Sequence, residues 1–298
     1  MIHSSEPFGT LSASAQAQLD AVGAVWATDI NKHRDLVVKT YSPLVQETDN
    51  SGIEVLRDLQ YGEDERHRLD VYTRSEFIKT EEPPRDVLMF FHGGAFIRGN
   101  KSANGAIYDN VSYWFAHQGC VAVNVEYRLA PQAPYPGGAE DVIAAVRWVQ
   151  QNITLFGGNV QRIFLMGHSA GGSHVAGALF DPAVPDRLSD ADVAGAMLIS
   201  ARLVADVLPD NPNANGVRAY FGEDASLYAV RSPASHVDGS NVPVLVAVAE
   251  HENTHLDRYG REFHAVLLAS NRTAPARFVD MPRHNHTSIV AHFNSGEE

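Results

Sequence analysis

The stretch Arg162–Gly172, RIFLMGHSAGG, constrains the fold of this chain more than any other part of the sequence. Its apolar run Ile163–Met166 is typical of a short, fully buried strand. Gly-His-Ser-Ala-Gly follows without a break, and the small residues after it suit a closely packed helix. A serine on a sharp strand-to-helix turn needs almost no side-chain bulk two residues before and two residues after it. The sequence therefore predicts that Ser169 is a catalytic nucleophile.

The motif alone is a weak indication, because the average glycine content lets chance produce it in roughly one chain in ten. The alternative interpretation is a glycine-rich turn whose serine has no chemical role. What favours the catalytic interpretation is the strand before the motif, the helix after it and the partner residues described below.

From Val87 onward, short apolar runs alternate with amphipathic stretches, which predicts an α/β fold with a mainly parallel sheet and helices on both faces. The expected strands are Val87–Phe91, Val121–Val125, Ile163–Met166, Val193–Ile199, Val244–Ala249 and Arg277–Val279. The expected helices are Asn104–His117, Gly138–Ile153, His255–Ser270 and Thr287–Phe293. Upstream, Ile53–Leu59 and Leu69–Tyr72 predict an antiparallel hairpin at the start of the sheet, which brings the strands to eight.

Three segments fall outside this alternation. Leu11 to about His33 predicts an amphipathic helix, followed by a polar connection over residues 40–52. Residues 79–86 predict a surface loop. The stretch Ala201–Asp238 holds three prolines and is long for a connection between two strands, which indicates a lid or an insertion without a role. We therefore predict one domain, residues 1–298, in which the N-terminal helix is either a plain packing helix or a segment that covers a pocket.

The composition excludes several classes of protein. Lys and Arg number 23 against 36 Asp and Glu, and the net charge of −13 argues against nucleic acid or an anionic membrane as the main partner. No apolar run is long enough to span a membrane, and the N-terminus lacks the pattern of a secretory leader, so a cytoplasmic location is expected. The single Cys120 is expected to be a small buried filler, and no cofactor is expected.

A serine is a poor nucleophile unless a base takes its proton and donors hold the oxyanion. The run His92-Gly93-Gly94-Ala95-Phe96 directly follows a predicted strand. Its glycines leave backbone N–H groups free to turn toward a reacting carbonyl, so Gly93 and Gly94 are expected to donate, with Ala170 as the third donor. His92 is expected to order this loop by hydrogen bonding.

The acid is expected in the loop after a late strand, and the base near the C-terminus. After Val244–Ala249 the sequence reads Glu250-His251-Glu252-Asn253. Glu252 is the preferred acid, and Glu250 and Asp257 are rivals that spacing alone does not separate.

His286 is the preferred base, because the small polar pair Thr287-Ser288 after it would open the last helix. His284 is its rival. A carboxylate on the Nδ1 atom of His286 would fix the tautomer of the ring and stabilise the imidazolium that forms when Ser169 attacks.

The acid segment also contains His251-Glu252-Asn253-Thr254-His255, which has the spacing of a zinc hydrolase motif. Against a metal site, this motif belongs in the middle of a helix, whereas here it directly follows a buried strand. No further ligand is evident, and the serine machinery would be left without a purpose, so no metal is predicted.

Three segments together resemble a known family: HGGAF, EYRLAPQAPYPGGAEDVIAAVRWV and FGGNVQRIFLMGHSAGG. They are similar to the hormone-sensitive-lipase-like branch of the α/β-hydrolase esterases, and about equally to the kynurenine formamidase-like hydrolases. The resemblance covers Val87 to the C-terminus. It implies that EHENTHLDRYGREF is the acid loop and MPRHNHTSIV the base loop, and so again Glu252 and His286. It further implies that a segment built on Tyr127, Arg128, Pro131 and Pro136 holds the oxyanion loop, and that the cap elements of the family correspond to residues at about 1–50 and 202–238.

The chain departs from the family at three places. HGGA replaces HGGG, which leans toward the formamidase-like and feruloyl-esterase-like relatives. GHSAG replaces GDSAG, and Glu252 replaces an aspartate and lengthens the acid by one methylene. None of these departures removes a needed chemical group.

The leading hypothesis is a serine hydrolase that cleaves small or medium carboxylic esters through an acyl-enzyme. An arylformamidase, acting on an amide of the N-formylkynurenine type with the same triad, is the alternative. A ligand-binding protein without activity is more remote. The expected partner is a small-molecule ester or amide substrate, and a homodimer stays open. Expected substrate-binding residues are His168, Phe96, Trp26, Tyr220 and Phe221, with Tyr41 and Tyr228 as further aromatic candidates.

Overall fold

The computed structural model describes residues 11–78 and 83–297. Its centre is an eight-stranded sheet with the order β1-β2-β4-β3-β5-β6-β7-β8. The first two strands pair antiparallel to each other, β2 pairs antiparallel to β4, and all other neighbours are parallel. This confirms the predicted fold class. The parts of the predicted cap and surface loop that fall on residues 1–10 and 79–82 lie outside the described residues.

The elements have the following bounds. The strands are β1 Ile53–Gln60, β2 Arg68–Arg74, β3 Arg85–Phe91, β4 Val121–Val125, β5 Gly158–His168, β6 Gly195–Ile199, β7 Val244–His251 and β8 Ala276–Asn285. The α-helices are α1 Ala13–Ala24, α2 Ile30–Glu47, α3 Ser75–Ile78, α4 Asp109–His117, α5 Gly137–Asn152, α6 Ala170–Phe180, α7 Ala214–Phe221, α8 Tyr228–Arg231, α9 Leu256–Ala269 and α10 Ser288–Ala291. Short 3₁₀ turns are Trp26–Thr28, Ile153–Phe156, Ala225–Leu227 and Pro233–Ser235.

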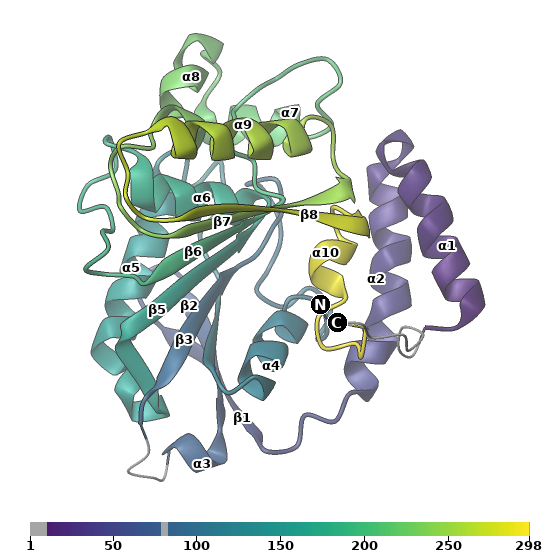
Figure 1. Cartoon of the computed structure of the whole chain (residues 1–298), viewed down its shortest axis with the longest axis vertical. Coiled ribbons are helices and arrows are strands. Elements are labelled where there is room, and N and C mark those ends of the chain that lie inside the picture. The colour runs from purple at the N-terminus through teal and green to yellow at the C-terminus, as the bar shows by residue number, and fades with distance from the viewer. Residues whose placement is uncertain (1–10, 79–82, 298) are drawn as a thin grey trace.

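Side-chain alternation along the strands divides the core between the two faces of the sheet. In β3, Val87, Met89 and Phe91 pack into the large cluster that also contains side chains of α5, α6 and α9. Leu88 and Phe90 point to the opposite face, where α4 and α10 cover the sheet. Figure 1 shows these two layers of helices on either side of the twisted sheet.

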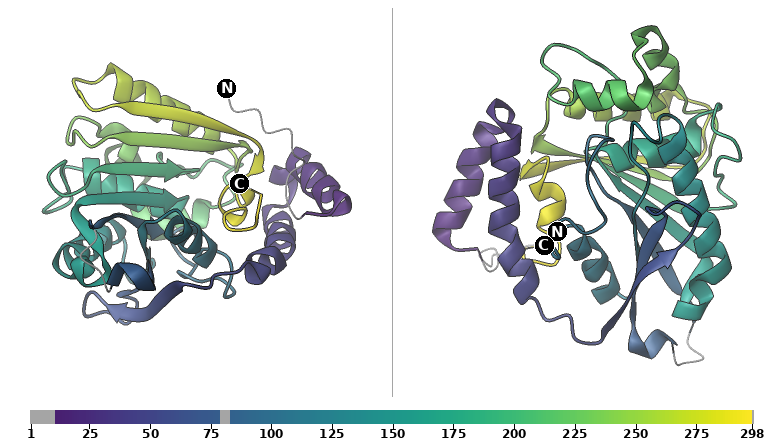
Figure 2. Two further views of the ribbon diagram at one scale, coloured as in Figure 1. Left: turned by 60° about the horizontal axis from the view of Figure 1, so that its bottom comes forward. Right: turned by 180° about the vertical axis from the view of Figure 1, so that it is seen from behind.

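The N-terminal part of the chain forms two helices rather than one helix and a polar connection. Helix α2 continues to Glu47, so the prediction of a connection over 40–52 was wrong. The physical reason is a buried stripe, Val37, Tyr41 and Val45, which repeats every four residues and faces the protein. Figure 1 and the reverse view in Figure 2 both show α1 and α2 side by side, next to α10.

Other boundaries also differ from the expectation. Helix α4 begins at Asp109, because the Asn104 side chain accepts from the Ala106 and Ile107 N–H groups and holds a turn there. Helix α10 is a single turn, and β8 extends to Asn285 along the edge of the sheet. Within the described residues, no helix is both long and apolar enough to cross a bilayer.

The stretch 201–238 carries α7 and α8, which lie near α9 at one end of the molecule (Figure 1). Its side chains Val217, Tyr220, Phe221 and Tyr228 pack with Phe96 and Ala170 in one buried cluster. This stretch is therefore tied directly to the loop after β3 and to the start of α6.

Strands β3, β5, β6, β7 and β8 run parallel, so their carboxyl ends meet at one edge of the sheet. In open sheets of this kind, ligands bind outside that edge. His92, Ser169, Ser200, Glu252 and His286 all lie at the ends of these strands or just after them.

Candidate active site

Ser169 occupies the sharp turn that joins β5 to α6. Its backbone has φ of 54° and ψ of −115°, a strained conformation for a residue with a side chain. The turn is tight because a Cβ on Gly167 would lie 2.6 Å from the backbone of Gly171, and one on Gly171 would lie 2.2 Å from the Phe91 carbonyl oxygen. The two glycines of the motif are thus required by close backbone approach, as the sequence predicted.

Ser169, His286 and Glu252 come together at this turn. The Ser169 Oγ lies 3.1 Å from His286 Nε2, and His286 Nδ1 lies 2.7 Å from Glu252 Oε2. Three loops separated by more than thirty residues each supply one of these side chains. This distance pattern is the one that lets a histidine take a proton from the serine hydroxyl while a carboxylate holds the ring.

Glu252 is buried, with its side chain 3% exposed. Oε1 accepts from the Ser200 hydroxyl and, at 3.0 Å, from the Ala249 N–H. Oε2 accepts from the Asn253 N–H at 3.2 Å as well as from His286. Burial alone would raise the pKa of this carboxyl, but His286 and these donors hold the pKa below its usual value. Glu252 is therefore an ionised carboxylate at neutral pH.

The rival acids lie elsewhere. Glu250 is exposed, and its Oε2 accepts from the Arg283 N–H at 2.7 Å. Asp257 is exposed on the first turn of α9. The rival base His284 contacts the Ser288 hydroxyl through Nδ1 at 3.2 Å. Among the described residues, none of these three side chains is hydrogen-bonded to Ser169 or to the His286 ring, so the structure brings the preferred residues together and not their rivals.

The three residues of the zinc-like spacing have three different surroundings. Glu252 contacts His286, whereas His255 Nε2 lies 3.1 Å from Asp210 Oδ1. The His251 ring packs against Gly23 of α1. The spacing therefore brings no common ligand set together among these side chains.

The loop after β3 turns sharply at Gly94, where φ is 151° and a Cβ would lie 1.7 Å from the Arg98 carbonyl oxygen. His92 is fully buried, and its Nδ1 donates to the Gly93 carbonyl at 2.8 Å. Its ring stacks on Tyr127, whose hydroxyl donates to the His92 carbonyl at 2.6 Å. The expected role of His92 in ordering this loop is confirmed.

Gly93 lies against the nucleophile, since a Cβ on it would be 3.2 Å from the Ser169 Cβ. Burial raises the pKa of the nearby Tyr108 hydroxyl to about 12, while a backbone hydrogen bond from Gly93 opposes the rise. Ala170 is the first residue of α6, where N–H groups lack partners within the helix. The oxyanion roles of Gly93, Gly94 and Ala170 stay predictions.

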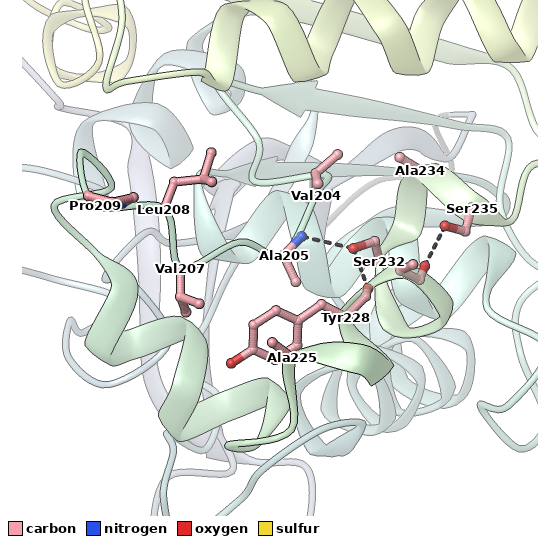
Figure 3. Close-up of a pocket in the computed structure, with 11 residues that line it drawn as sticks. Val204, Ala205, Val207, Leu208, Pro209, Ala225, Tyr228, Ser232, Ala234 and Ser235 are labelled. Atoms are coloured by element: carbon pink, nitrogen blue, oxygen red, sulfur yellow. Dashed lines mark hydrogen bonds between the residues drawn. The ribbon is translucent and has the colours of Figure 1, made fainter.

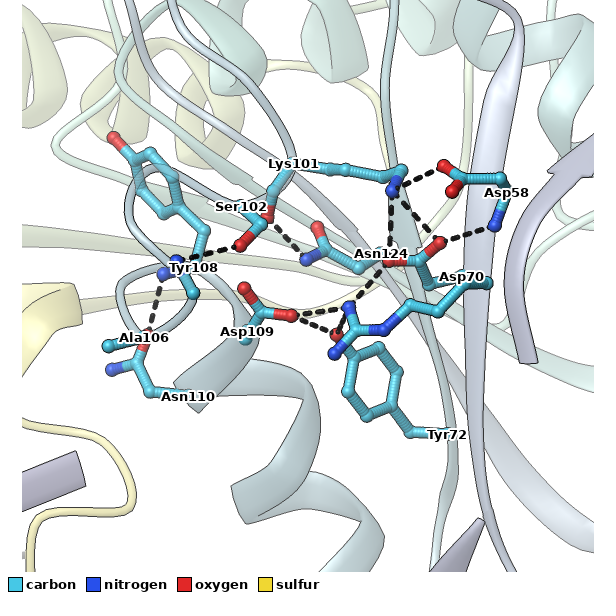
Figure 4. A network of polar contacts seen from close by, with 12 residues as sticks. Asp58, Asp70, Tyr72, Lys101, Ser102, Ala106, Tyr108, Asp109, Asn110 and Asn124 are labelled. Carbon is cyan, nitrogen blue, oxygen red and sulfur yellow. Dashed lines mark hydrogen bonds and ion pairs between the residues drawn. The ribbon is translucent and has the colours of Figure 1, made fainter. Parts of the chain in front are cut away.

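A polar network around the buried Asp70 and Asp109 anchors the loop of residues 93–108 (Figure 4). Lys101 Nζ lies 2.9 Å from both Asp58 Oδ1 and Asp70 Oδ1. Arg57 bridges Asp70 at 2.7 Å and Asp109, the first residue of α4, at 2.5 Å. Asn124 donates to the Lys101 carbonyl. This network joins β1, β2 and β4 to Lys101 inside the loop and to Asp109 directly after it.

Replacing Asp70 with alanine should lower the free energy of unfolding by about 3 kcal/mol, because it leaves Arg57 and Lys101 without their shared, fully buried partner. Urea unfolding at neutral pH measures this change. The control is Asp86→Ala, which removes the exposed pair with Arg162 and should cost less than about 1 kcal/mol. Equal losses in the two variants would contradict the role given to the network.

Two buried histidines make stability depend on pH. Burial lowers the pKa of His92 to about 3 and that of His174 to about 4. Both values lie below about 6.5, the value in an unfolded chain. The unfolded state therefore binds more protons below pH 6.5, and the free energy of unfolding should fall as the pH drops from about 6.5 toward 4. Each histidine contributes up to about 1.4 kcal/mol per pH unit.

Urea unfolding at pH 7.5, 6.5 and 5.5 measures this slope. In His174→Asn the slope below pH 6.5 should be smaller than in the wild type, because one titrating group is gone. An unchanged slope in the variant would show that His174 is not the source of the effect.

The predicted substrate-binding residues are all buried, and three of them pack in one cluster with Ala170. Phe96 and Tyr220 are stacked with ring centroids 4.8 Å apart, and Phe221 packs edge-on against both. Trp26 is 2% exposed and donates from Nε1 to Asn253 Oδ1 at 2.9 Å. The contact of these residues with a substrate stays a prediction, and so does the contact of His168 with a substrate.

The segment 202–238 contains an apolar cavity of about 520 Å³ (Figure 3). Val204, Leu208 and Tyr228 are among its walls, and Ser232 closes one side by accepting from the Ala205 N–H at 2.8 Å. Ala205 and Tyr228 also belong to the cluster that packs on Ala170. Ser169 and His286 are not among the residues that line this cavity.

Sequence reasoning missed three residues of the site: Ser200, Tyr108 and Asn253. Ser200 directly follows β6, at the same edge of the sheet as Ser169, and this position was the one available signal. Tyr108 contacts His168, which lies 60 positions further along the chain, and Asn253 contacts Trp26, which lies 227 positions earlier. No local sequence pattern encodes contacts over such separations.

Comparison with known proteins places this chain in a family. Residues 88–287 match the family of the alpha/beta hydrolase fold. Over 161 residues, or 51% of this chain, the sequence is 33% identical to carboxylesterase 1D of Mus musculus, of which the match covers 27%. It is 35% identical over 116 residues, or 39% of this chain, to esterase LipC of Mycobacterium tuberculosis, again covering 27% of that protein. The matched stretches thus span about a quarter of these relatives.

Solved structures match over nearly the whole chain. A bacterial heroin esterase superposes with a TM-score of 0.69 at 22% identity, covering 94% of this chain and 93% of that one. An esterase of Pyrobaculum calidifontis gives a TM-score of 0.68 at 22% identity, with 96% and 93% covered. Together with the serine turn, the sheet order and the family match, these likenesses lead to one conclusion: the chain belongs to the alpha/beta hydrolase fold family.

Proposed function

We propose that this protein is a serine hydrolase that cleaves small or medium carboxylic esters through an acyl-enzyme intermediate. The observation that carries the proposal is the line of contacts from Ser169 through His286 to the buried, ionised Glu252. The sequence similarity to carboxylesterase 1D and esterase LipC supports an ester as the substrate.

In the proposed reaction, His286 Nε2 takes the Ser169 proton as Oγ attacks the ester carbonyl carbon. The negative charge that develops on the carbonyl oxygen is stabilised by N–H groups at the start of α6 and in the loop of residues 93–94. The imidazolium then gives its proton to the leaving alcohol, and the acyl group stays on Ser169.

Water completes the cycle. His286 takes a proton from the water as it attacks the acyl-enzyme, and returns the proton to Ser169 when the acid leaves. Throughout, Glu252 keeps the Nδ1–H tautomer of the ring and offsets the charge of the imidazolium.

The test is a panel of p-nitrophenyl acetate, butyrate and octanoate together with N-formylkynurenine. Turnover of the short esters, lost in Ser169→Ala, is the expected result. Turnover of N-formylkynurenine alone would identify the formamide, and not an ester, as the substrate. The test needs both substrate classes because ester and formamide hydrolysis pass through the same kind of tetrahedral intermediate. No turnover of any compound would contradict the proposed function.

A further inference from the structure

The side chain next to the nucleophile contacts the backbone of the base. His168 Nε2 lies 2.8 Å from the His286 carbonyl oxygen, and the two rings are 4.9 Å apart. His168 is 3% exposed, so its polar atoms depend on protein partners. Adjacent residues of one turn thus hold the same histidine: His168 holds its main chain, and Ser169 meets its side chain.

The other ring nitrogen of His168 also has a partner. Its Nδ1 lies 3.3 Å from the hydroxyl of Tyr108, which precedes α4. A Cβ on Gly93 would lie 3.0 Å from that hydroxyl and 2.8 Å from His168 Nδ1. Tyr108 and His168 therefore meet where the loop after β3 touches the serine turn.

The protonation states fix the direction of these bonds. Burial first, and His286 second, hold the pKa of His168 well below its usual value, so the ring is neutral. Tyr108 keeps its proton, since its pKa is raised to about 12. A neutral ring has one donor and one acceptor nitrogen, and a carbonyl can only accept. Hence His168 Nε2–H donates to His286, and Tyr108 donates to His168 Nδ1.

The peptide of the base is consequently fixed on both sides. The His286 N–H donates to the His251 carbonyl at 3.1 Å, at the end of β7. Its carbonyl accepts from His168, at the end of β5. Asn110 of α4 also holds the helix after His286 by donating to the Val290 and Ala291 carbonyls, but the contact that reaches the His286 peptide itself from the nucleophile turn is that of His168.

We propose that His168 is a positioning residue for the catalytic base, and that Tyr108 aligns it through the hydroxyl contact with Nδ1. This inference rests on the proposed function. The bond from His168 to the His286 carbonyl sets the distance between Nε2 of the base and Oγ of Ser169. Because an error of about 1 Å in such a distance can cost about 100-fold in rate, the effect falls on kcat rather than on KM.

The variants differ in whether they keep a donor at the Nε2 position. A glutamine amide can reach that position, whereas asparagine is one methylene shorter and leucine has no donor. His168→Leu and His168→Asn should lose about 10- to 100-fold in kcat with little change in KM, and His168→Gln should recover most of that loss. Tyr108→Phe should lose less, about 2- to 10-fold.

The matched control is His264 on α9. Its Nε2 also contacts a main-chain carbonyl, that of Ala276, at 3.3 Å. His264→Leu should leave kcat and KM at their wild-type values. Each variant is checked for a cooperative thermal transition, and if His168→Leu does not fold, the comparison of His168→Asn with His168→Gln carries the test.

A second readout is the rate at which a fluorophosphonate labels Ser169, because this reaction needs the aligned base but not the natural substrate. The proposal predicts the same order of rates: wild type and His168→Gln fast, His168→Asn and His168→Leu slow. Wild-type rates in His168→Asn, or equal losses in His168→Asn and His168→Gln, would overturn the positioning role alone. Failure of the wild type both to label and to hydrolyse any ester would instead overturn the proposed function.

Discussion

Ser169→Ala should lower kcat for p-nitrophenyl butyrate by about 10⁶-fold, to the level that remains when a serine nucleophile is removed from a hydrolase. The reason is that no covalent intermediate can form without the Oγ that faces His286 at 3.1 Å. Steady-state release of p-nitrophenolate measures the loss, and the thermal midpoint shows whether the variant is folded.

Ser173→Ala is the matched control for this substitution. Ser173 lies one turn further along α6 and is also buried, and among the described residues the hydroxyl that His286 Nε2 contacts is that of Ser169, not that of Ser173. Its replacement should keep the activity. A Ser169→Ala protein that still turns over the ester at a tenth of the wild-type rate would contradict the assignment of the nucleophile.

Glu252→Gln should lower kcat by about 10³- to 10⁴-fold. The amide keeps the shape of the side chain but removes the charge that stabilises the imidazolium, and it can present an N–H to His286 Nδ1, which favours the wrong tautomer. Glu252→Asp keeps the charge and should lose less. The measurement is kcat for the same ester at a pH where the wild type is fully active.

Glu250→Gln and Asp257→Asn are the controls, because both carboxylates are exposed, whereas the carboxylate on His286 Nδ1 is that of the buried Glu252. Each should retain the activity of the wild type. A loss in either one as large as that in Glu252→Gln would move the acid role to that residue.

Much of this arrangement could be predicted from the sequence because it depends on local signals. The apolar run before Gly167 and the small residues after Ser169 indicate a strand, a turn and a helix without knowledge of the rest of the chain. The order of serine, acid and base along the chain then follows from parallel strands that end at one edge of the sheet.

Boundaries that depend on tertiary packing were predicted less well. Pro43 and the polar residues around it indicate a connection, yet α2 continues because Tyr41 and Val45 are buried against the protein. Tertiary burial overrides a local propensity of a fraction of a kcal/mol per residue. In the same way, α10 ends after one turn and β8 runs on at the edge, where pairing with β7 decides its length.

The supporting contacts of the site could not be predicted for a related reason. Three side-chain hydrogen bonds join segments that are distant in sequence: Ser200 to Glu252, Trp26 to Asn253 and Tyr108 to His168. Serine, asparagine and tyrosine are common residues, and only the fold gives these three a distinctive position.

Active-site titration with diethyl p-nitrophenyl phosphate tests directly whether Ser169 is the nucleophile. One equivalent of p-nitrophenolate should be released per chain as activity is lost, and the diethylphosphoryl adduct should map to the peptide containing Ser169. Ser169→Ala should give neither release nor adduct. An adduct on another residue, or loss of esterase activity without an adduct on Ser169, would show that Ser169 is not the nucleophile.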